Sequence, residues 1–356
     1  MSIYQAKDYQ IHIGGSEVFK ELNDFILGHY ADRKKIILVD ENTMEHCYPL
    51  FMQSLPNLED AEVLEIPSGE ENKTIEICTQ LWLALNELAI DRKAVFINLG
   101  GGVIGDMGGF VASTFKRGID FINVPTTLLS QVDASVGGKL GVDLEKGKNL
   151  VGLFQNPKAV FINTDFLSTL DGRQVKSGFA EVIKHGLIAD LSYYEKLKST
   201  DPGDLDWNEI VHTSVKIKGA VVAEDPTEQG LRKNLNFGHT IGHAVESYYL
   251  EKENFLLHGE AVVIGMVAEG YLSNQYGELR EANLDDLVAF LKCYYEFPMI
   301  DESGIDLMLD YMKMDKKNEE GSIQYVQLKT IGKASFGHQA TREQLKEAIL
   351  YYNSLL

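Results

Sequence analysis

Three histidines that lie close together in the sequence give the strongest chemical signal. His239 and His243 are four residues apart in the stretch FGHTIGH, and His258 begins the next apolar helical pattern in HGE. Residues four apart share one face of a helix. Glu181 lies in a third apolar helical pattern, AEVIKH. Two imidazoles and a carboxylate are a natural ligand set for a divalent metal, with open positions for a substrate. The spacing does not decide which two histidines bind, and a single core histidine needs no ligand at all.

Polar residues near these histidines extend the same chemistry. Lys184 follows Glu181 by three residues, and Arg232 and Asn236 are four apart just before His239. An arginine and an amide on one helix face would recognise an anion and a hydroxyl group. These residues would therefore extend the histidine face with anion and hydroxyl recognition.

A glycine-rich turn offers a second kind of chemistry. The stretch GGGVIGD follows a short apolar run and precedes a helical pattern, and Gly100, Gly102 and Gly105 match the G-x-G-x-x-G spacing. Glycine lets the backbone approach a pyrophosphate, and a helix N-terminus supplies free N–H groups. The acidic residue of the usual fingerprint follows the glycines, whereas here Asp40 precedes them. The turn predicts either an unusual dinucleotide site or a plain strand-to-helix connection.

Two other segments combine small and charged residues. In PSGEENKT, Glu70 could accept a hydrogen bond from a ribose and Lys73 could face a phosphate, although a capped, solvated helix start is the simpler interpretation. Residues 116–152 hold a Pro-Thr-Thr turn and Gly-Gly-Lys and Gly-Lys-Asn turns, with four basic residues: Arg117, Lys139, Lys146 and Lys148. Such turns suit an anionic ligand. A mobile surface loop is the alternative for this longer segment.

The elements that must position these residues change in type along the chain. Short apolar runs rich in β-branched residues occupy 35–39, 94–99, 121–124 and 159–163, with a helical pattern at 74–88. This alternation predicts a doubly wound parallel sheet. Helical patterns then dominate, at 178–189, 207–224, 239–249, 259–276 and 284–295, and 323–328 predicts one arm of a β-hairpin before Gly332. We expect an α/β domain at 1–165 and a mostly helical domain at 166–356, packed together around a shared cleft because no linker separates them.

Composition narrows the class of protein. The chain of 356 residues is 44% hydrophobic and 24% charged, which is ordinary for a globular protein and excludes a wholly disordered chain. Its formal net charge of −20 disfavours binding to nucleic acid or anionic membranes, so an anionic substrate needs a local basic cluster. Three widely spaced cysteines and the absence of an apolar leader in the first residues predict a cytoplasmic protein with reduced thiols.

Six stretches, in this order, closely resemble the 3-dehydroquinate synthase family: GGGVIGDMGGFVAS, RGIDFINVPTTLLSQVDASVGGKLGV, GKNLVG, AEVIKHG, LNFGHTIGHAVE and HGEAV. The resemblance implies an N-terminal NAD-binding α/β domain, a C-terminal helical domain and an active site in the cleft between them. It implies a phosphate-eliminating lyase of the shikimate pathway, which leads to chorismate and the aromatic amino acids. The cofactors would be NAD and one divalent metal, zinc or cobalt, and the assembly a homodimer.

The resemblance also implies roles for individual residues. The metal ligands would be Glu181, His239 and His258, which leaves His243 on the substrate side. NAD would contact Asp40, Glu70, Lys73, Gly101, Gly102, Val103, Ile104, Gly105, Asp106, Thr126, Thr127, Lys139, Lys148, Phe166, Leu167, Ser168 and Thr169. Substrate would contact Asp133, Lys139, Asn149, Lys184, Lys218, Arg232, Asn236, His243 and one of Lys316 and Lys317, with Arg117 reaching the phosphate across a dimer interface. Leu140 and Asp143 depart mildly from the family pattern beside the cofactor.

The implied substrate is 3-deoxy-D-arabino-heptulosonate 7-phosphate and the products are 3-dehydroquinate and phosphate. Transient oxidation would be followed by phosphate elimination, reduction, ring opening and an intramolecular aldol. Another sugar phosphate cyclase, such as a 2-deoxy-scyllo-inosose synthase, would use a substrate without a carboxylate. A metal-dependent polyol dehydrogenase resembling glycerol dehydrogenase would need no phosphate cluster, and a non-catalytic NAD-binding protein would not need the full set of site residues.

Overall fold

The computed structural model describes residues 1–144, 147–250, 252–314 and 323–356. The chain forms two compact units, one of Met1–Asp171 with Asp206–Gly219 and one of Gly172–Leu205 with Ala220–Leu356. The sequence placed the boundary at residues 165 and 166 and gave everything beyond it to the helical domain. The segment Asp206–Gly219 belongs to the first unit because its side chains bond there. His212 Nδ1 lies 2.9 Å from Ser2 Oγ, and Asn208 Oδ1 accepts a 2.9 Å hydrogen bond from the Thr164 hydroxyl.

The first unit is built on a seven-stranded sheet with the order β1-β2-β9-β6-β5-β3-β4. Only the β1–β2 pair is antiparallel among the strand pairs described in this sheet. The strands are β1 (Ser2–Gln5), β2 (Gln10–Gly14), β3 (Lys35–Asp40), β4 (Glu62–Ile66), β5 (Val95–Gly100), β6 (Asp120–Pro125) and β9 (Ala159–Asn163). A separate antiparallel hairpin is formed by β7 (Lys139–Leu144) and β8 (Gly147–Phe154). The predicted doubly wound parallel sheet is confirmed.

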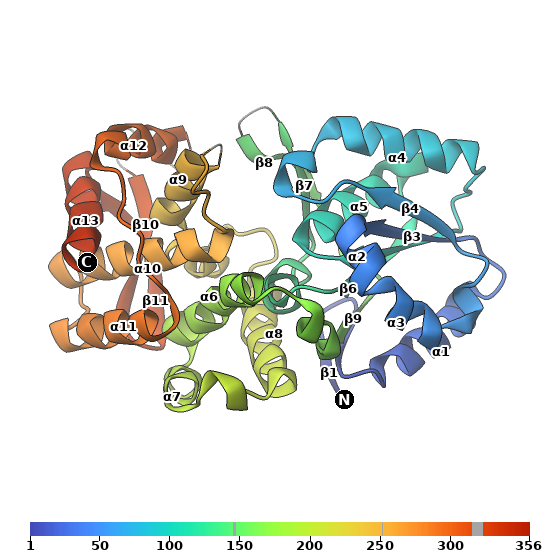
Figure 1. The fold of residues 1–356 in the computed structure, drawn as a ribbon, viewed down its shortest axis with the longest axis horizontal. Helices are drawn as coiled ribbons and strands as arrows, with labels where there is room; N and C mark the ends of the chain where they lie inside the picture. Colours follow the sequence, from blue (N-terminus) through green and yellow to red (C-terminus); the bar gives the residue numbers. More distant parts are fainter. Residues whose placement is uncertain (145–146, 251, 315–322) are drawn as a thin grey trace. The chain divides into compact units, whose positions relative to one another are not determined.

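Helices cover both faces of this sheet (Figure 1). Ile37 and Val39 of β3 pack with α1 (Val18–Tyr30) and α3 (Tyr48–Ser54), whereas Ile36 and Leu38 pack with α4 (Ile75–Glu87) and α5 (Gly102–Thr114). Successive side chains of a strand point to opposite faces, so a run that is apolar at every position must be buried on both. Between β3 and α3 lies the short α2 (Glu41–His46).

The order of the strands changes direction at β3, which lies between β4 and β5 in the sheet. From β3 the chain goes through α2 and α3 to β4 on one side, and from β4 it crosses back through α4 to β5 on the other side. The carboxyl ends of β3 and β5 are therefore neighbours from which the chain leaves toward opposite faces of the sheet. Ligands of doubly wound folds bind at such a switch point. Asp40 ends β3 and Gly100 ends β5, so the fold brings the two predicted cofactor elements to this edge.

The second unit is mainly helical and has α10 (His258–Gln275) at its centre. Most positions of α10 are buried, including all ten from Ala261 to Gly270, as expected of a helix that is apolar all round. It packs against α6 (Gly172–Ala189), α9 (His239–Tyr249), α11 (Glu281–Tyr294) and α13 (Arg342–Ser354). The remaining elements of this part are α7 (Leu191–Ser199), α12 (Ile305–Met314) and the hairpin of β10 (Ile323–Thr330) and β11 (Lys333–Ala340), while α8 (Trp207–Glu224) begins in the first unit. The predicted β-hairpin is confirmed, and Gly332 forms its turn with a φ of +84°.

Within the described residues, no helix has both the length and the apolar character that a membrane-spanning segment requires.

Candidate functional site

The glycine-rich turn joins β5 to α5 in the first unit. Gly101 is the N-cap of α5. No side-chain hydrogen bond from this N-cap position to the first N–H groups of the helix is present in the described part of the chain. The first N–H groups of this helix therefore remain available for an anionic ligand. The Thr126 N–H donates to Gly100 O (3.1 Å) and ties the end of β6 to the same turn. The predicted turn is thus built like a phosphate cradle.

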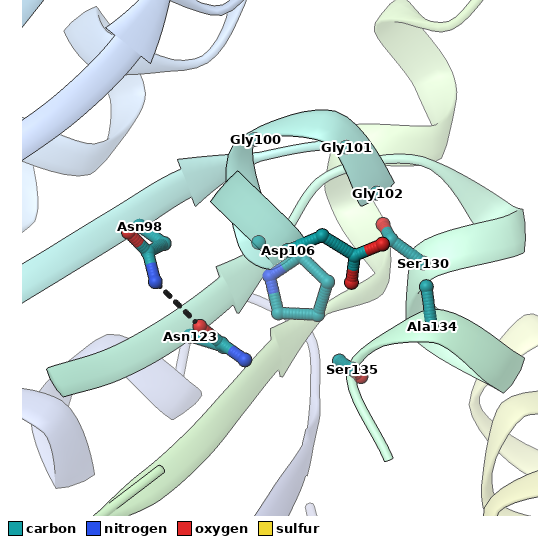
Figure 2. A pocket seen from close by; sticks show the side chains of 11 residues that line it. Asn98, Gly100, Gly101, Gly102, Asp106, Asn123, Ser130, Ala134 and Ser135 are labelled. Carbon is teal, nitrogen blue, oxygen red and sulfur yellow. Dashed lines mark hydrogen bonds between the residues drawn. The ribbon is translucent and has the colours of Figure 1, made fainter. Parts of the chain in front are cut away.

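A pocket adjoins this turn on the face of the sheet that α5 covers. Its lining is made of small and polar residues: Asn98, Gly100, Gly101, Gly102, Gly105, Asp106, Asn123, Pro125, Ser130, Ala134 and Ser135. Figure 2 shows the Asn98 amide directed at Asn123, to which it donates a 2.8 Å hydrogen bond. In the part of the chain that the structure describes, the buried Asn98 Oδ1 and Ser135 Oγ have no hydrogen-bond partner. Asn98 Oδ1 faces Gly108 of α5, but Ser135 Oγ lacks, among the described residues, the partner that buried polar atoms normally have, so the pocket suits a polar ligand.

Gly108 allows α5 to lie against the sheet beneath the pocket. A Cβ atom at this position would come within 2.0 Å of Asn98 Oδ1 and 2.8 Å of Leu38 Cδ2. A side chain at this position would push α5 away from β5 and β3. Packing therefore explains Gly108, and also Gly100, where a Cβ atom would come within 2.5 Å of Ile104.

Asp40 and Glu70 lie beside the same edge of the sheet. The Asp40 carboxylate caps α2, accepting a 2.8 Å hydrogen bond from the Thr43 N–H, while Thr43 Oγ1 accepts from the Asp40 N–H. This capping box holds Asp40 at the end of β3. Glu70 lies in a short 3₁₀ turn that is partly exposed, with its carboxylate 3.8 Å from Lys73 Nζ. Their predicted contacts with NAD stay predictions.

Lys73 is buried, not solvated. Its side chain is 4% exposed, and Nζ donates to Asp106 Oδ2 (2.7 Å) and to Asn149 Oδ1 (2.8 Å). Asn149 in turn donates its N–H to Asp143 Oδ1 (2.6 Å). Burial on its own lowers the pKa of Lys73, but the carboxylates of Asp106 and Glu70 raise it above the ordinary value. Lys73, just before α4, therefore binds Asp106 of α5 and Asn149 of β8 through its ammonium group.

Replacing Lys73 by methionine should lower the free energy of unfolding by about 1–3 kcal/mol, because it removes the buried cation from the partly buried Asp106 carboxylate. The Asp106→Asn change in the same chain should restore part of that loss. Urea unfolding of the two single variants and the double variant gives the coupling energy. Strictly additive losses would show that the 2.7 Å pair does not stabilise the protein.

The remaining predicted NAD contacts are distributed around the first unit. Thr126 is buried, and Thr127 shares hydrogen bonds with Ser130 at the start of a π-helical turn, Ser130–Ala134. Such turns are frequent at functional sites. Lys139 begins β7 after two glycines with positive φ, and Lys148 lies in β8. The residues 166–169 form part of a 3₁₀ helix, Thr164–Thr169, after β9, in which Phe166 and Leu167 are buried.

Two predicted substrate residues of the first unit contact each other. Lys218 Nζ lies 2.8 Å from Asp133 Oδ1 and donates a 2.6 Å hydrogen bond to Asp133 O. The sequence separates these residues by 85 positions, and the return of residues 206–219 to the first unit brings them together. The pair gives this unit a buried lysine beside the π-helical turn.

Arg117 lies at an unusual point of the backbone. It is exposed, and both Lys116 (φ +49°) and Arg117 (φ +67°) adopt left-handed conformations before Gly118 (φ +107°). Non-glycine residues in this region cost about 1–3 kcal/mol each and occur preferentially at functional sites. The structure holds Arg117 in a strained turn between α5 and β6.

The predicted metal ligands meet in the second unit. Glu181 Oε1, on α6, lies 3.5 Å from His239 Nε2 and 3.5 Å from His258 Nε2. Ligand atoms of a tetrahedral zinc ion at about 2.1 Å are about 3.4 Å from one another. Glu181 is fully buried, and these three residues come from the starts of α9 and α10 and the middle of α6. The donor set and its spacing fit a divalent metal.

Neighbouring groups orient both imidazoles. His239 Nδ1 is 3.2 Å from Phe237 O, and His258 Nδ1 is 3.3 Å from Glu246 Oε2, so each Nε2 is left to face Glu181. A hydrogen bond on the other ring nitrogen is the usual support of a metal-binding histidine. Burial and Lys184 hold the pKa of His239 well below its usual value. Burial also lowers the pKa of His258, but Glu246 and Glu181 outweigh it and raise the pKa to about 10, as expected where the surroundings attract a cation.

His243 and Lys184 complete this cluster. The ring nitrogens of His239, His243 and His258 lie within 4.8 Å of one another, so a three-histidine set remains geometrically possible. His243 is exposed, however, unlike the other predicted ligands. Lys184 is buried and forms an ion pair with Glu181 Oε2. The second carboxylate oxygen of Glu181 is thus held by a cation, which leaves Oε1 toward the histidines.

Arg232 and Asn236 lie in a 3₁₀ helix before α9. Arg232 is 1% exposed, with Nη1 donating to Pro226 O (2.6 Å), and the Asn236 amide donates to Glu228 Oε1 (2.6 Å). The structure places both in the helical unit but leaves their substrate contacts as predictions. The predicted Lys316 and Lys317 lie outside the described residues.

The sequence interpretation missed Glu246 and the Asn98–Asn123 pair. Glu246 follows His239 by seven residues, which places both on one face of α9, so the heptad spacing could have identified it. The asparagine pair had no such signal, because each residue is a single polar position in an apolar strand and their contact depends on the register of β5 and β6.

Comparison with known proteins covers nearly the whole chain. The family model described as 3-dehydroquinate synthase N-terminal matches residues 63–177, and the model described as 3-dehydroquinate synthase C-terminal matches residues 178–318. A 3-dehydroquinate synthase from Parabacteroides distasonis is 43% identical over 335 residues, which is 93% of this chain and 94% of that protein.

Solved structures give the same fold. A 2-deoxy-scyllo-inosose synthase complexed with carbaglucose-6-phosphate, NAD⁺ and Co²⁺ has a TM-score of 0.85 at 26% identity, covering 98% of this chain and 99% of that one. A 2-epi-5-epi-valiolone synthase from Streptomyces hygroscopicus subsp. jinggangensis, with NAD⁺ and Zn²⁺ bound, has a TM-score of 0.85 at 25% identity, covering 100% and 99%.

Proposed function

The chain belongs to the 3-dehydroquinate synthase family, and we propose that it performs that reaction with the glycine-rich cradle of the first unit and the histidine cluster of the second. The substrate is 3-deoxy-D-arabino-heptulosonate 7-phosphate and the products are 3-dehydroquinate and phosphate. One observation supports the proposal most strongly: Glu181 Oε1 is equidistant, at 3.5 Å, from the two imidazole nitrogens of His239 and His258. The chemistry needs such a site for the substrate hydroxyl that is oxidised.

NAD would be held by the turn at 101–106 and a divalent ion by Glu181, His239 and His258; when bound, the first supplies a hydride acceptor and the second polarises a hydroxyl group. Lys184 balances the buried Glu181 carboxylate beside this site. His243, which is exposed, is available to move a proton at a ring nitrogen. The ion pair of the partly exposed Asp133 and the buried Lys218 offers a carboxylate and an ammonium group to the hydroxyl and phosphate groups of the substrate.

The substrate carries both a carboxylate and a phosphate. We assign the carboxylate to Arg232 and Asn236, whose side chains are the natural partners of such a group. Lys139 and Arg117 are assigned to the phosphate, together with Lys184 and Lys218. Oxidation creates a ketone that acidifies the neighbouring C–H, so that phosphate can leave before the hydride returns. The ring then opens and an intramolecular aldol closes the carbocycle, and the role of the residues is to hold one reactive conformer at each step.

The decisive assay follows phosphate release by the purified protein from the heptulosonate phosphate, with NAD⁺ and Co²⁺ or Zn²⁺. A parallel reaction with glucose 6-phosphate tests the second candidate, a cyclase for sugars without a carboxylate, which the TM-score of 0.85 to a 2-deoxy-scyllo-inosose synthase favours. Turnover of only the second sugar would exclude the first function.

The proposal includes a homodimer in which Arg117 reaches the phosphate site of the other subunit. Mixing Arg117→Ala protein with Lys184→Ala protein should restore up to about a quarter of the activity, since about half of randomly formed dimers are hybrids with one complete site. Subunit exchange is verified by tagging one variant. Absence of recovery, with hybrids demonstrated, means that Arg117 acts in its own subunit.

We place the enzyme in the cytoplasm, because Cys47, Cys78 and Cys293 are all free thiols, as is usual in a reducing compartment.

A further inference from the structure

The helix that contributes His239 receives its N-terminal cap from another helix. Gly238 is the N-cap of α9, has a φ of +81° and provides no side chain to bond the first N–H groups. Glu269 of α10 takes this place. Its Oε2 accepts a 2.8 Å hydrogen bond from the Gly238 N–H, and its Oε1 accepts a 3.2 Å bond from the Ile241 N–H. A fully buried carboxylate thus bonds the backbone on both sides of His239.

The two helices touch through their backbones at this point. A Cβ atom on Gly265 of α10 would lie 1.8 Å from Gly238 O, and one on Gly238 would lie 2.7 Å from Met266 Cγ. The approach is possible only because glycine occupies both positions. It brings Glu269, one turn beyond Gly265, within reach of the α9 N-terminus. The crossing leaves no room for α9 to move toward α10, and the carboxylate prevents it from moving away.

The contact between the α9 N-terminus and Glu269 of α10 connects two of the predicted metal ligands. His239 lies between the two residues that Glu269 bonds, and His258 is the first residue of the helix that contains Glu269. The backbone of α10 therefore joins His258 to Glu269, and Glu269 holds the backbone on both sides of His239. We propose that Glu269 is a positioning residue that sets the distance between His239 and His258; this inference rests on the metal site proposed above.

The two oxygen atoms of Glu269 matter as well as the length of its side chain. The carboxyl group presents one oxygen to each of the two N–H groups. A glutamine of the same size presents one oxygen and one NH₂ group, so one backbone N–H would face a donor. The Glu269→Gln variant should therefore release one side of the clamp without creating a cavity.

The test measures Co²⁺ binding by the full-length protein, without substrate. For Glu269→Gln we expect the Co²⁺ dissociation constant to rise about 10–100-fold, the range found when supporting groups of metal ligands are changed. We also expect the visible absorption spectrum of bound Co²⁺ to change, because the ligand geometry changes. Glu269→Asp keeps the carboxyl group and shortens the side chain by one methylene, so its dissociation constant should fall between those of the other two proteins. It replaces Glu269→Gln if that variant does not fold.

Asp190→Ala is the matched control. Asp190 caps α7 through a 3.0 Å hydrogen bond from the Tyr193 N–H, and none of the predicted ligands lies on α7. The Asp190→Ala variant should have lower thermal stability, with the Co²⁺ dissociation constant and the absorption spectrum of bound Co²⁺ unchanged. An unchanged dissociation constant and spectrum in folded Glu269→Gln, or an equal loss of affinity in Asp190→Ala, would overturn the positioning role. A lack of Co²⁺ binding by the unsubstituted protein is a separate result, because it rejects the metal site itself and the role of Glu269 with it.

Discussion

Purified His258→Ala protein is expected to contain no divalent metal and to release phosphate at least about a thousandfold more slowly than the unsubstituted enzyme. Loss of Lewis-acid polarisation removes several kcal/mol of transition-state stabilisation, and about 4 kcal/mol corresponds to that factor. The physical reason is local. His258 Nε2 faces Glu181 Oε1 at 3.5 Å, so its removal leaves a single imidazole and a carboxylate, too few ligands for a stable site. Metal analysis after dialysis and the phosphate assay measure the two effects.

Two companions make this result interpretable. His258→Gln keeps an amide beside Glu246, so it separates loss of the metal from loss of the hydrogen bond between residue 258 and that buried carboxylate. His243→Ala should lose activity but keep its metal, because His243 is assigned to the substrate. Full metal occupancy in His258→Ala would reject the ligand assignment. Loss of metal in His243→Ala would instead support the three-histidine set, whose nitrogens lie within 4.8 Å of one another.

The second large effect concerns the stoichiometry of NAD. We expect each NAD⁺ to support many turnovers, with less than one NAD⁺ consumed per molecule of product and no lasting rise in absorbance from NADH. The hydride removed in the first step is returned before product leaves, so the cofactor ends each cycle unchanged. An ordinary polyol dehydrogenase with the same cradle and metal site would release NADH after each reaction.

The measurement follows phosphate and NADH together, with NAD⁺ well below the substrate concentration. Phosphate release far beyond the amount of NAD⁺, without NADH, confirms the closed cycle. NADH that accumulates one-for-one with product would contradict it and favour the dehydrogenase. As a control, Lys139→Ala and Lys218→Ala should slow phosphate release, since both lysines are assigned to the phosphate. Neither variant should accumulate NADH, because the hydride is still returned within the same cycle.

The sequence predicted the central strands well because they are apolar on both faces. The run 159–163 matches β9 at both ends, and α8 and α9 also agree with their predicted ranges. The edge strand β4 was missed because Glu62 and Glu65 interrupt its apolar residues, and β1 because it has only four residues. The boundary of the units could not be predicted from local patterns, since the packing of Asp206–Gly219 on the first unit depends on contacts with residues far away in the sequence.

In the candidate site, too, local patterns predicted some features, whereas others depend on contacts between distant residues. Helical spacing brought His239 and His243 onto one face but could not decide between them as partners of His258. The fold adds that Glu181 Oε1 lies 3.5 Å from both His239 Nε2 and His258 Nε2, which no helical spacing could show, and the choice of ligands stays a prediction. Lys73 looked like a solvated lysine at a helix start, because its carboxylate partner, Asp106, lies 33 residues further along the chain. Long-range pairs of this kind leave no periodic signal.

The discontinuous first unit has a consequence for how the protein is made. Its main segment ends at Asp171, but the part that contains Lys218 and His212 extends to Gly219, after a stretch that belongs to the other unit. On the ribosome, the strands of the sheet are complete at Asn163, but the first unit must wait for 48 residues beyond Asp171 (172–219) before its last segment is made, about 2–10 s at ordinary rates of synthesis. During that interval Asp133 lacks Lys218 and Ser2 lacks His212. A nascent chain stalled at Asp171 should thus expose an incomplete first unit to chaperones and proteases, and no cut at a single peptide bond separates the two units into independently complete fragments.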